Sequence, residues 1–353
     1  MRRLFVFAIA LYSILLVSCK NNGVIQGVDT FLETPQKRMT LEKDSSFVCD
    51  LPDILYCQNL QIVEDSILVI QSLPQEGKST LFDAYSIPGF QHLGSFVTQG
   101  RGPDEIPAPE IVGSDTKQNL LYIRDNATGD AYIIDVHKGI HTHEDDYIQN
   151  VHLPDNVVDW APINRSTYLS LVHEGEELTL RMHSHETYIF HPYAGINAHN
   201  YMTKLSTKIT GNEASGKSAL AMVCFPQIAI VDSNSHALRS IAVDPSYRNW
   251  ESILNRPFGP ETIQYYRKII SSDRYIIALY DGCSLSDLIH SDSGHRPALH
   301  VFDWNGNFLY DFQIKTGIEA MCYEPLSSCL YCIESTSGQL IRYDLSILDS
   351  ILF

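Results

Sequence analysis

Residues 297–314 read PALHVFDWNGNFLYDFQI, and this stretch decides the fold class. Apolar and polar residues alternate up to Asp303, as they do in a strand with one buried face. The pair Asn305-Gly306 then supplies the residues that a tight hairpin turn requires, and a second alternating run follows it. The stretch therefore predicts two antiparallel strands joined by a turn.

Similar units recur along the chain, each with a polar residue at the end of an apolar strand. The marker residues are Asp83, Asp135, His191, Asp244, Asp303 and Asp344. Their spacing of roughly 50 residues is typical of propeller blades, small sheets that cannot bury both faces alone. We therefore expect an all-β chain that forms a six-bladed β-propeller of four-stranded antiparallel blades, and we expect residues 347–353 to form its final outer strand.

A second repeat supports this count. The sequence GRGPDE at 100–105 is echoed by RPFGPE at 256–261, about three blade periods later. Glycine permits positive φ, proline fixes the next φ, and a carboxylate can cap backbone N–H groups, so both segments suit a crossover between blades. Residues 24–50 are expected to donate a strand that closes the ring and removes its free sheet edges.

The N-terminus has the features of an export signal. Arg2 and Arg3 precede an apolar run, 4–17, which is too short to span a bilayer core of about 30 Å. The run ends in LVSC, 16–19, which resembles the lipobox of bacterial lipoproteins, in which the cysteine is lipidated. We expect residues 1–18 to be a lipoprotein signal peptide, 19–30 a tether lipidated at Cys19, and 31–353 the propeller. A plain secretory signal is the alternative.

Together these features resemble a known family. The lipobox, the six repeats and the GRGPDE motif after a predicted outer strand are similar to Bacteroidetes-type six-bladed β-propeller lipoproteins, described as TolB-like or NHL-like. The resemblance covers residues 25–353. It implies a lipid-anchored propeller in the cell envelope, attached to the outer membrane, and it implies no particular reaction.

The charge balance limits the partners. The chain has 25 basic and 42 acidic residues, a formal net charge of −17. Such a surface repels nucleic acid and anionic lipid, so we expect no nucleic-acid partner and membrane contact only through the lipid anchor. The residues after Cys19, KNNGV, lack an acidic cluster, which favours a periplasm-facing position.

The sequence GNEASGKS, 211–218, matches the pattern of a phosphate-binding loop. Such a loop needs a buried apolar strand before it and a helix after it. The preceding stretch carries Lys204 and Lys208, and the alternation of strands and helices is missing. We interpret the segment as a loop between strands and expect no nucleotide partner.

Two histidine clusters could hold a divalent metal. His141 and His143, and likewise His183 and His185, would share one face of an extended strand. Solvated loops have the same composition, so the expected cofactor is none, with a divalent metal as the alternative. Seven cysteines besides Cys19 show no spacing of a disulfide framework, and we expect most of them to be small buried apolar residues.

Five charged residues in the two crossover motifs are candidates for ligand binding: Arg101, Asp104, Glu105, Arg256 and Glu261. If they line one propeller face, they could hold a polar ligand. If they cap the crossovers, they pair internally, which the surrounding turn-forming residues favour.

Two function classes follow. The first is a binding module for a cell-envelope protein, peptide or glycan, at a face ringed by inter-strand loops. The second is a propeller enzyme, a metal-assisted hydrolase or lyase acting at the central channel. The sequence contains no nucleophile elbow, and no catalytic residue is assigned.

Overall fold

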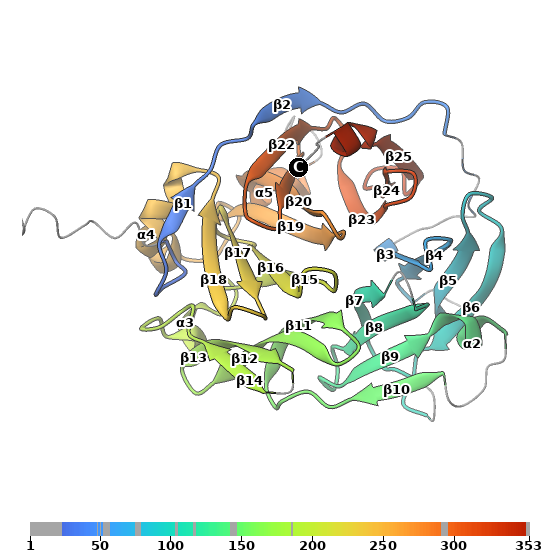
Figure 1. The fold of residues 1–353 in the computed structure, drawn as a ribbon, viewed down its shortest axis with the longest axis horizontal. Coiled ribbons are helices and arrows are strands. Elements are labelled where there is room, and N and C mark those ends of the chain that lie inside the picture. The colour runs from blue at the N-terminus through green and yellow to red at the C-terminus, as the bar shows by residue number, and fades with distance from the viewer. Residues whose placement is uncertain are drawn as a thin grey trace, which may run out of the picture.

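The computed structural model describes residues 23–47, 49, 51, 57–74, 79–102, 105–115, 118–141, 147–184, 186–290 and 296–350. These residues form six small β-sheets arranged around a common centre (Figure 1). The predicted six-bladed propeller is confirmed. Cys19, Asp104, His143 and His185 lie outside the described residues.

Each blade is built from consecutive strands, numbered from the centre outward. Blade one contains β3 (Cys57–Val63), β4 (Ile67–Ser72), β5 (Thr80–Ser86) and β6 (His92–Thr98). Blade two contains β7 (Pro109–Asp115), β8 (Leu120–Asp125), β9 (Ala131–Asp135) and β10 (Ile148–Val151). Blade three contains β11 (Val157–Asn164), β12 (Thr167–Glu174), β13 (Glu177–His183) and β14 (Thr187–Phe190).

The second half of the ring follows the same plan with local changes. Blade four contains β15 (Thr207–Asn212), β16 (Lys217–Met222), β17 (Gln227–Asp232) and β18 (Ala237–Ala242). Blade five contains β19 (Ile263–Ser271), β20 (Tyr275–Ser284), β21 (Ala298–Asp303) and β22 (Phe308–Gln313). Blade six contains β23 (Ile318–Glu324), β24 (Cys329–Glu334) and β25 (Leu340–Asp344).

The core lies between the blades. All six residues of β4 and all six of β21 are buried, because the middle strands of a blade are covered on both faces by neighbouring sheets. The innermost strands contact one another in a closed cycle, from β3 through β7, β11, β15 and β19 to β23 and back to β3. This cycle holds the inner strands around the axis of the ring.

Aspartates at the ends of third strands explain why the sequence unit repeats. Asp303 accepts hydrogen bonds from the backbone N–H groups of Asn305 and Asn307, both at 2.9 Å, and so holds the turn between β21 and β22. Asp232 accepts one from the N–H of Asn234 at 2.8 Å in the corresponding turn of blade four. A carboxylate at this position favours the turn that a hairpin needs.

The predicted markers identify the third strand in four blades and miss it in two. Asp83, Asp135, Asp303 and Asp344 lie on third strands. The prediction is wrong for His191 and Asp244, because these residues follow the fourth strands β14 and β18. The third strand ends in His183 in blade three and in Ser86 in blade one, where Asp83 lies within the strand, so the aspartate that ends the other third strands is absent from both.

The chain departs from uniform four-stranded blades at its two ends. Blade six has three strands among the residues that the structure describes, and a 3₁₀-helix, η3 (Ser346–Ser350), stands where an outer strand was expected. Blades four and five each have five strands, because β1 (Thr30–Leu32) and β2 (Lys37–Thr40) add to them. The expected ring-closing strand is therefore wrong in its position: the N-terminal strands lie on the outer edges of blades four and five.

We call residues 23–47 the strap, because they run along the outside of blades four, five and six (Figure 1). β1 pairs in parallel with β18, and β2 pairs in parallel with β22. Beyond them, the N–H of Asp44 donates to the carbonyl of Arg342 in blade six at 2.8 Å. The strap thus covers two outer edges that would otherwise offer unpaired backbone groups.

The strap begins earlier than the expected boundary at residue 31. Val24 is 0% exposed and Ile25 is 2% exposed, and both belong to the core between blades three and four. The N–H of Val24 donates to Oε1 of Gln227 at 3.0 Å. Residues 23–30, assigned above to a tether, are therefore packed onto the propeller.

The ring closes where β23 of blade six meets β3 of blade one. We call this joint the seam. Its core includes Leu60 and Ile62 from β3 and Ala320 and Cys322 from β23. No strand is shared across the seam among the residues described, so packing between the two sheets holds it closed.

The helices are short and peripheral. They are α2 (Val136–His141), α3 (Ala198–Tyr201), η1 (Pro245–Asn249), α4 (Trp250–Asn255) and α5 (Leu285–Ile289). Within the described ranges, none of them is long and apolar enough to cross a membrane. No disulfide joins the seven cysteines described; five of them are buried and Cys49 and Cys283 are half-buried, so most are buried, as the sequence predicted.

Candidate functional site

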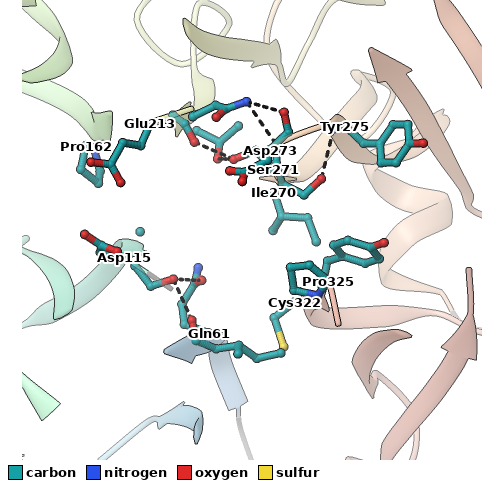
Figure 2. Close-up of a pocket in the computed structure, with 18 of the residues that line it drawn as sticks. Gln61, Asp115, Pro162, Glu213, Ile270, Ser271, Asp273, Tyr275, Cys322 and Pro325 are labelled. Carbon is teal, nitrogen blue, oxygen red and sulfur yellow. Dashed lines mark hydrogen bonds between the residues drawn. The ribbon is translucent and has the colours of Figure 1, made fainter. Parts of the chain in front are cut away.

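The six innermost strands end at the same face of the ring, where each turns back into the second strand of its blade. A cavity of about 440 Å³ lies at this face, and we call it the hairpin-face cavity. Figure 2 shows lining residues from all six blades around it: Gln61, Asp115, Pro162, Glu213, Ile270, Ser271, Asp273, Tyr275, Cys322 and Pro325. No single blade forms this site.

The charge of the cavity is strongly acidic. Among the residues that the structure describes, five carboxylates line it, from five different segments: Asp65, Asp115, Glu213, Asp273 and Asp349. The same described residues contribute one cationic side chain, Arg274. Its guanidinium lies 3.9 Å from Oδ1 of Asp349 and stacks on the ring of Tyr275, so part of its charge is already balanced. The cavity therefore favours a positively charged group.

The lining of the cavity combines polar and apolar surface in similar amounts. Its apolar residues include Ile62, Ile163, Ile209 and Ile269, which come from the inner strands of four blades and also pack in the cores between blades. All four are buried, with exposures between 2% and 8%. The site thus combines apolar residues with carboxylates.

Hydrogen bonds between blades fix the shape of the wall. Oγ of Ser271 donates to the carbonyl of Gly211 at 2.7 Å, and Nδ2 of Asn212 donates to the carbonyl of Asp273 at 3.1 Å. Both bonds join blade four to blade five. On the opposite side, Oγ of Ser114 donates to Oε1 of Gln61 at 3.0 Å, which joins blade two to blade one.

Tyr122 is the buried polar residue of the cavity. It is 2% exposed, and its hydroxyl has no hydrogen-bond partner among the residues that the structure describes. The ring packs edge-on against Trp160, with centroids 6.2 Å apart, which fixes its direction. Burial raises the pKa of Tyr122, the nearby Asp115 and Glu213 carboxylates raise it further, and the Arg165 cation partly offsets them. An unsatisfied buried hydroxyl costs about 1–3 kcal/mol unless a ligand supplies its partner.

The GNEASGKS segment borders the same cavity. Gly211 and Asn212 end β15, and Lys217 and Ser218 begin β16 opposite them in antiparallel register. The segment is a hairpin, as predicted, whereas a phosphate-binding loop leads into a helix. Nζ of Lys217 points away from the segment and donates to the carbonyl of Trp304 at 3.1 Å.

A second cavity of about 460 Å³ lies at the opposite face, where the inner strands begin. Glu110, Arg124, Asp159 and Lys208 line it, so both signs of charge are present. Burial raises the pKa of Asp159 to about 6, while nearby Lys208 partly offsets this. The hairpin-face cavity differs from it by its excess of carboxylates.

Of the five charged residues predicted to bind a ligand, the four that the structure describes do not form one site. Glu105 folds back on its own crossover, and its Oε2 accepts from the N–H of Gly102 at 2.7 Å. This is the internal cap that the turn-forming residues favoured. Arg101 is exposed beside it, between blades one and two.

The other motif lies three blades away. Arg256 ends α4, where its N–H donates to the carbonyl of Ser252 at 3.2 Å, and Glu261 is exposed before β19. Both motifs precede inner strands, as expected for crossovers, and so lie at the face opposite the hairpin-face cavity. Phe258 of the second motif lines the second cavity.

The described histidines of the metal hypothesis lie in different blades. His141 ends α2 in blade two and stacks on His137, with ring centroids 6.1 Å apart. His183 ends β13 in blade three, where Nε2 lies 2.9 Å from Oγ of Ser170. Burial lowers the pKa of His183 to about 4. No group of three metal-binding side chains occurs in the part of the chain that the structure describes, and the metal site remains a prediction.

Sequence reasoning missed the carboxylates of the hairpin-face cavity. Asp115 ends the innermost strand of its blade, Asp65, Glu213 and Asp273 come just after theirs, and Asp349 lies in η3, so they are far apart in the sequence. An acidic residue in or next to the first hairpin of successive blades is the signal that could have found them. That signal becomes visible only when the strand order of each blade is known.

Comparisons with known proteins bear on the fold. A family model described as TolB-like 6-blade propeller-like matches residues 59–324. A solved structure of a DUF4221 family member from Bacteroides vulgatus is similar, with a TM-score of 0.51 and 12% identity over 87% of this chain and 94% of that one. The extracellular domain of a protein described as a one-component system from B. thetaiotaomicron has a TM-score of 0.45 and 12% identity, over 81% of this chain and 33% of that one. No curated protein matches the sequence significantly.

Proposed function

Because the chain belongs to the TolB-like six-bladed β-propeller family, we propose that it is a binding module whose ligand site is the hairpin-face cavity. The observation that carries this proposal is the convergence of all six blades on one cavity. A volume of about 440 Å³ lies within the roughly 300–1,000 Å³ typical of ligand pockets. The ligand is a protein segment, peptide or glycan of the cell envelope.

The arrangement suits binding because the scaffold is rigid and the lining is varied. The inner strands form a closed cycle of contacts, and inter-blade hydrogen bonds hold Ser271 and Asn212 in place. Loops carried on such a scaffold can present side chains without reorganising when a ligand binds.

A lipid on Cys19 would attach this module to the outer membrane, facing the periplasm. Three residues separate Cys19 from Gly23, whose N–H donates to Oγ1 of Thr30 at 3.2 Å. A chain this short reaches at most about 14 Å, so the anchor would hold the outer edges of blades three and four close to the bilayer. Metabolic labelling with an alkynyl fatty acid tests this: the label should be present on the native chain and absent from Cys19→Ala.

The binding site is tested by blocking each face in turn. Glu213→Trp fills the mouth of the hairpin-face cavity, and Glu261→Trp places the same ring on the opposite face. Both positions are exposed, so neither change should lower the melting temperature by more than a few degrees. The wild type and both variants are titrated with short peptides of varied charge and with neutral oligosaccharides.

We expect a probe to bind the wild type and Glu261→Trp, and we expect Glu213→Trp to lose this binding. Equal binding by both variants would place the site elsewhere. Each probe is also recovered and weighed by mass spectrometry. Cleavage or elimination products would favour the propeller-enzyme alternative, a metal-assisted hydrolase or lyase, over a binding module.

A further inference from the structure

We propose that the hairpin-face cavity binds an ammonium or guanidinium group on an aliphatic stem, supplied by a lysine or arginine side chain of a peptide. This inference rests on the proposed function and names the ligand class of the same site. Two independent observations point to it. One is the charge and shape of the cavity, and the other is the unpartnered hydroxyl of Tyr122 within it.

The lining matches both parts of such a side chain. The apolar part of the lining, which includes Ile62 and Ile269, can cover a methylene stem, and the carboxylates of Asp115 and Glu213, which line the same cavity, can hold the charged end. Arg274 is the cation already at the rim, and it is engaged by Asp349 and Tyr275 on the side of blade five. On the side of blades two and four, the described lining residues include no cation.

Tyr122 identifies where the ligand's N–H groups would point. Its hydroxyl is buried and has no hydrogen-bond partner among the described residues. The charges of Asp115 and Glu213 act on it, and that of Arg165 opposes them. A phenol oxygen can accept a hydrogen bond from an ammonium or guanidinium N–H while its own proton is donated to a carboxylate. A neutral sugar hydroxyl could also reach it, but would bring no positive charge to the acidic lining.

The test uses the full chain and defined probes measured by isothermal titration calorimetry. A hexalysine peptide is compared with hexaglutamate, spermine and a neutral chitotetraose. The double variant Asp115→Asn, Glu213→Gln is compared with Asp155→Asn, Glu261→Gln, which removes the same charge from exposed positions before inner strands, at the opposite face. Asparagine at 115 keeps the oxygen that accepts from the N–H of Gln118 at 3.1 Å.

We expect hexalysine to bind the wild type and the Asp155, Glu261 control equally. The Asp115, Glu213 variant should bind it at least about tenfold more weakly. Tyr122→Phe should weaken binding by about threefold to tenfold while the melting temperature stays the same or rises, since no native hydrogen bond is lost. A Tyr122 of purely structural importance would instead lower the melting temperature.

The remaining outcomes separate this inference from the proposed function. Equal weakening by both double variants would show attraction to the net charge of the whole chain and would overturn the inference. If chitotetraose binds the wild type but not Glu213→Trp, and hexalysine does not bind, the cavity is a ligand site but its ligand is not cationic. That result would support the proposed function and overturn this inference. If spermine binds as tightly as hexalysine, the site recognises the alkylammonium group alone. The inference that a peptide supplies this group would then be wrong. If no probe binds, the inference fails.

Discussion

At the scale of single residues, the wall of the hairpin-face cavity depends on how closely the inner strands approach. A Cβ atom added to Gly211 would lie 1.9 Å from the carbonyl oxygen of Pro162, and one added to Gly113 would lie 2.9 Å from the ring of the same proline. Blades two, three and four therefore meet at Gly113, Pro162 and Gly211, and the two glycines have no side chain to hold the strands apart. Neither contact is with the flexible end of a side chain, so neither can be relieved cheaply.

Gly211→Ala should therefore destabilise the protein. We expect a loss of about 1–3 kcal/mol in the free energy of unfolding, because β11 or β15 must shift to admit the methyl group. Chemical denaturation measures this. Gly259→Ala is the matched control: a Cβ there meets nothing within 4 Å, and its effect should stay within about 0.5 kcal/mol. Equal effects at the two glycines would contradict the close approach.

His300 makes the free energy of unfolding depend on pH. It is 5% exposed between Tyr266 and Tyr280, and burial lowers its pKa to about 3. The unfolded chain has a histidine pKa near 6.5, so between these values it binds more protons than the folded chain. The contribution of His300 to the free energy of unfolding is therefore fully present above about pH 6.5, and it is lost as the pH falls toward the pKa of the folded state.

Between pH 7.5 and pH 5.0 the loss from His300 should be about 2 kcal/mol. His300→Gln removes the titration and should reduce the pH dependence of the unfolding free energy by this amount. Urea denaturation of both proteins at the two pH values measures the difference. An identical pH dependence in wild type and variant would show that His300 is not held neutral.

At the scale of elements, the strap is an integral part of the sheet structure. Its parallel pairing with β18 and β22 was not predictable from periodicity, because β1 and β2 are only three and four residues long. Their exposed faces also hide the alternation that marks a strand: all four residues of β2 are exposed. The sequence did predict the hairpins in which an aspartate is followed by a turn that contains glycine. This signal lies within a few neighbouring residues.

Ile25→Ala tests whether the strap carries stability. A buried isoleucine truncated to alanine costs about 2–5 kcal/mol, and Ile25 is 2% exposed. Met39→Ala, on the same strap but 37% exposed, should change the unfolding free energy by less than about 0.5 kcal/mol. No change from Ile25→Ala would mean that these residues act as a loose tether, as the sequence suggested.

At the scale of the whole molecule, blade number followed from the sequence, and the composition of the cavity did not. The repeat of Asp83, Asp135, Asp303 and Asp344 depends on turns within one blade, so it leaves a local signal. The cavity instead joins residues such as Asp65 and Asp273, which are brought together only by closure of the ring. Contacts of that kind leave no pattern in a single sequence.

We expect the seam to open before the joint between blades three and four. The strap buries Val24 and Ile25 in the joint between blades three and four. It reaches the seam at its last residue, Phe47, whose half-buried ring contacts Phe90 of blade one and Tyr331 of blade six. Cys322 lies in the core of the seam, and Cys224 lies in the core between blades three and four. Both are buried thiols whose pKa is raised by burial, so both react only after local opening.

In low concentrations of urea, Cys322 should therefore be alkylated faster than Cys224. Mass spectrometry of peptides at timed intervals measures both rates on one sample. Full denaturation provides the reference in which the two thiols react alike. Equal rates under native conditions would show that the seam opens only when the whole protein unfolds.

The strap also sets an order of events during synthesis. Thr30 bonds to Ser240, Arg38 to Asp311, and Asp44 to Arg342, which are separations of 210, 273 and 298 residues. A ribosome that adds about 5–20 residues per second needs roughly 10–60 s to produce those partners. The strap is thus made long before its partners, and it can take its place only after the outer strands of blades four and five have been synthesised.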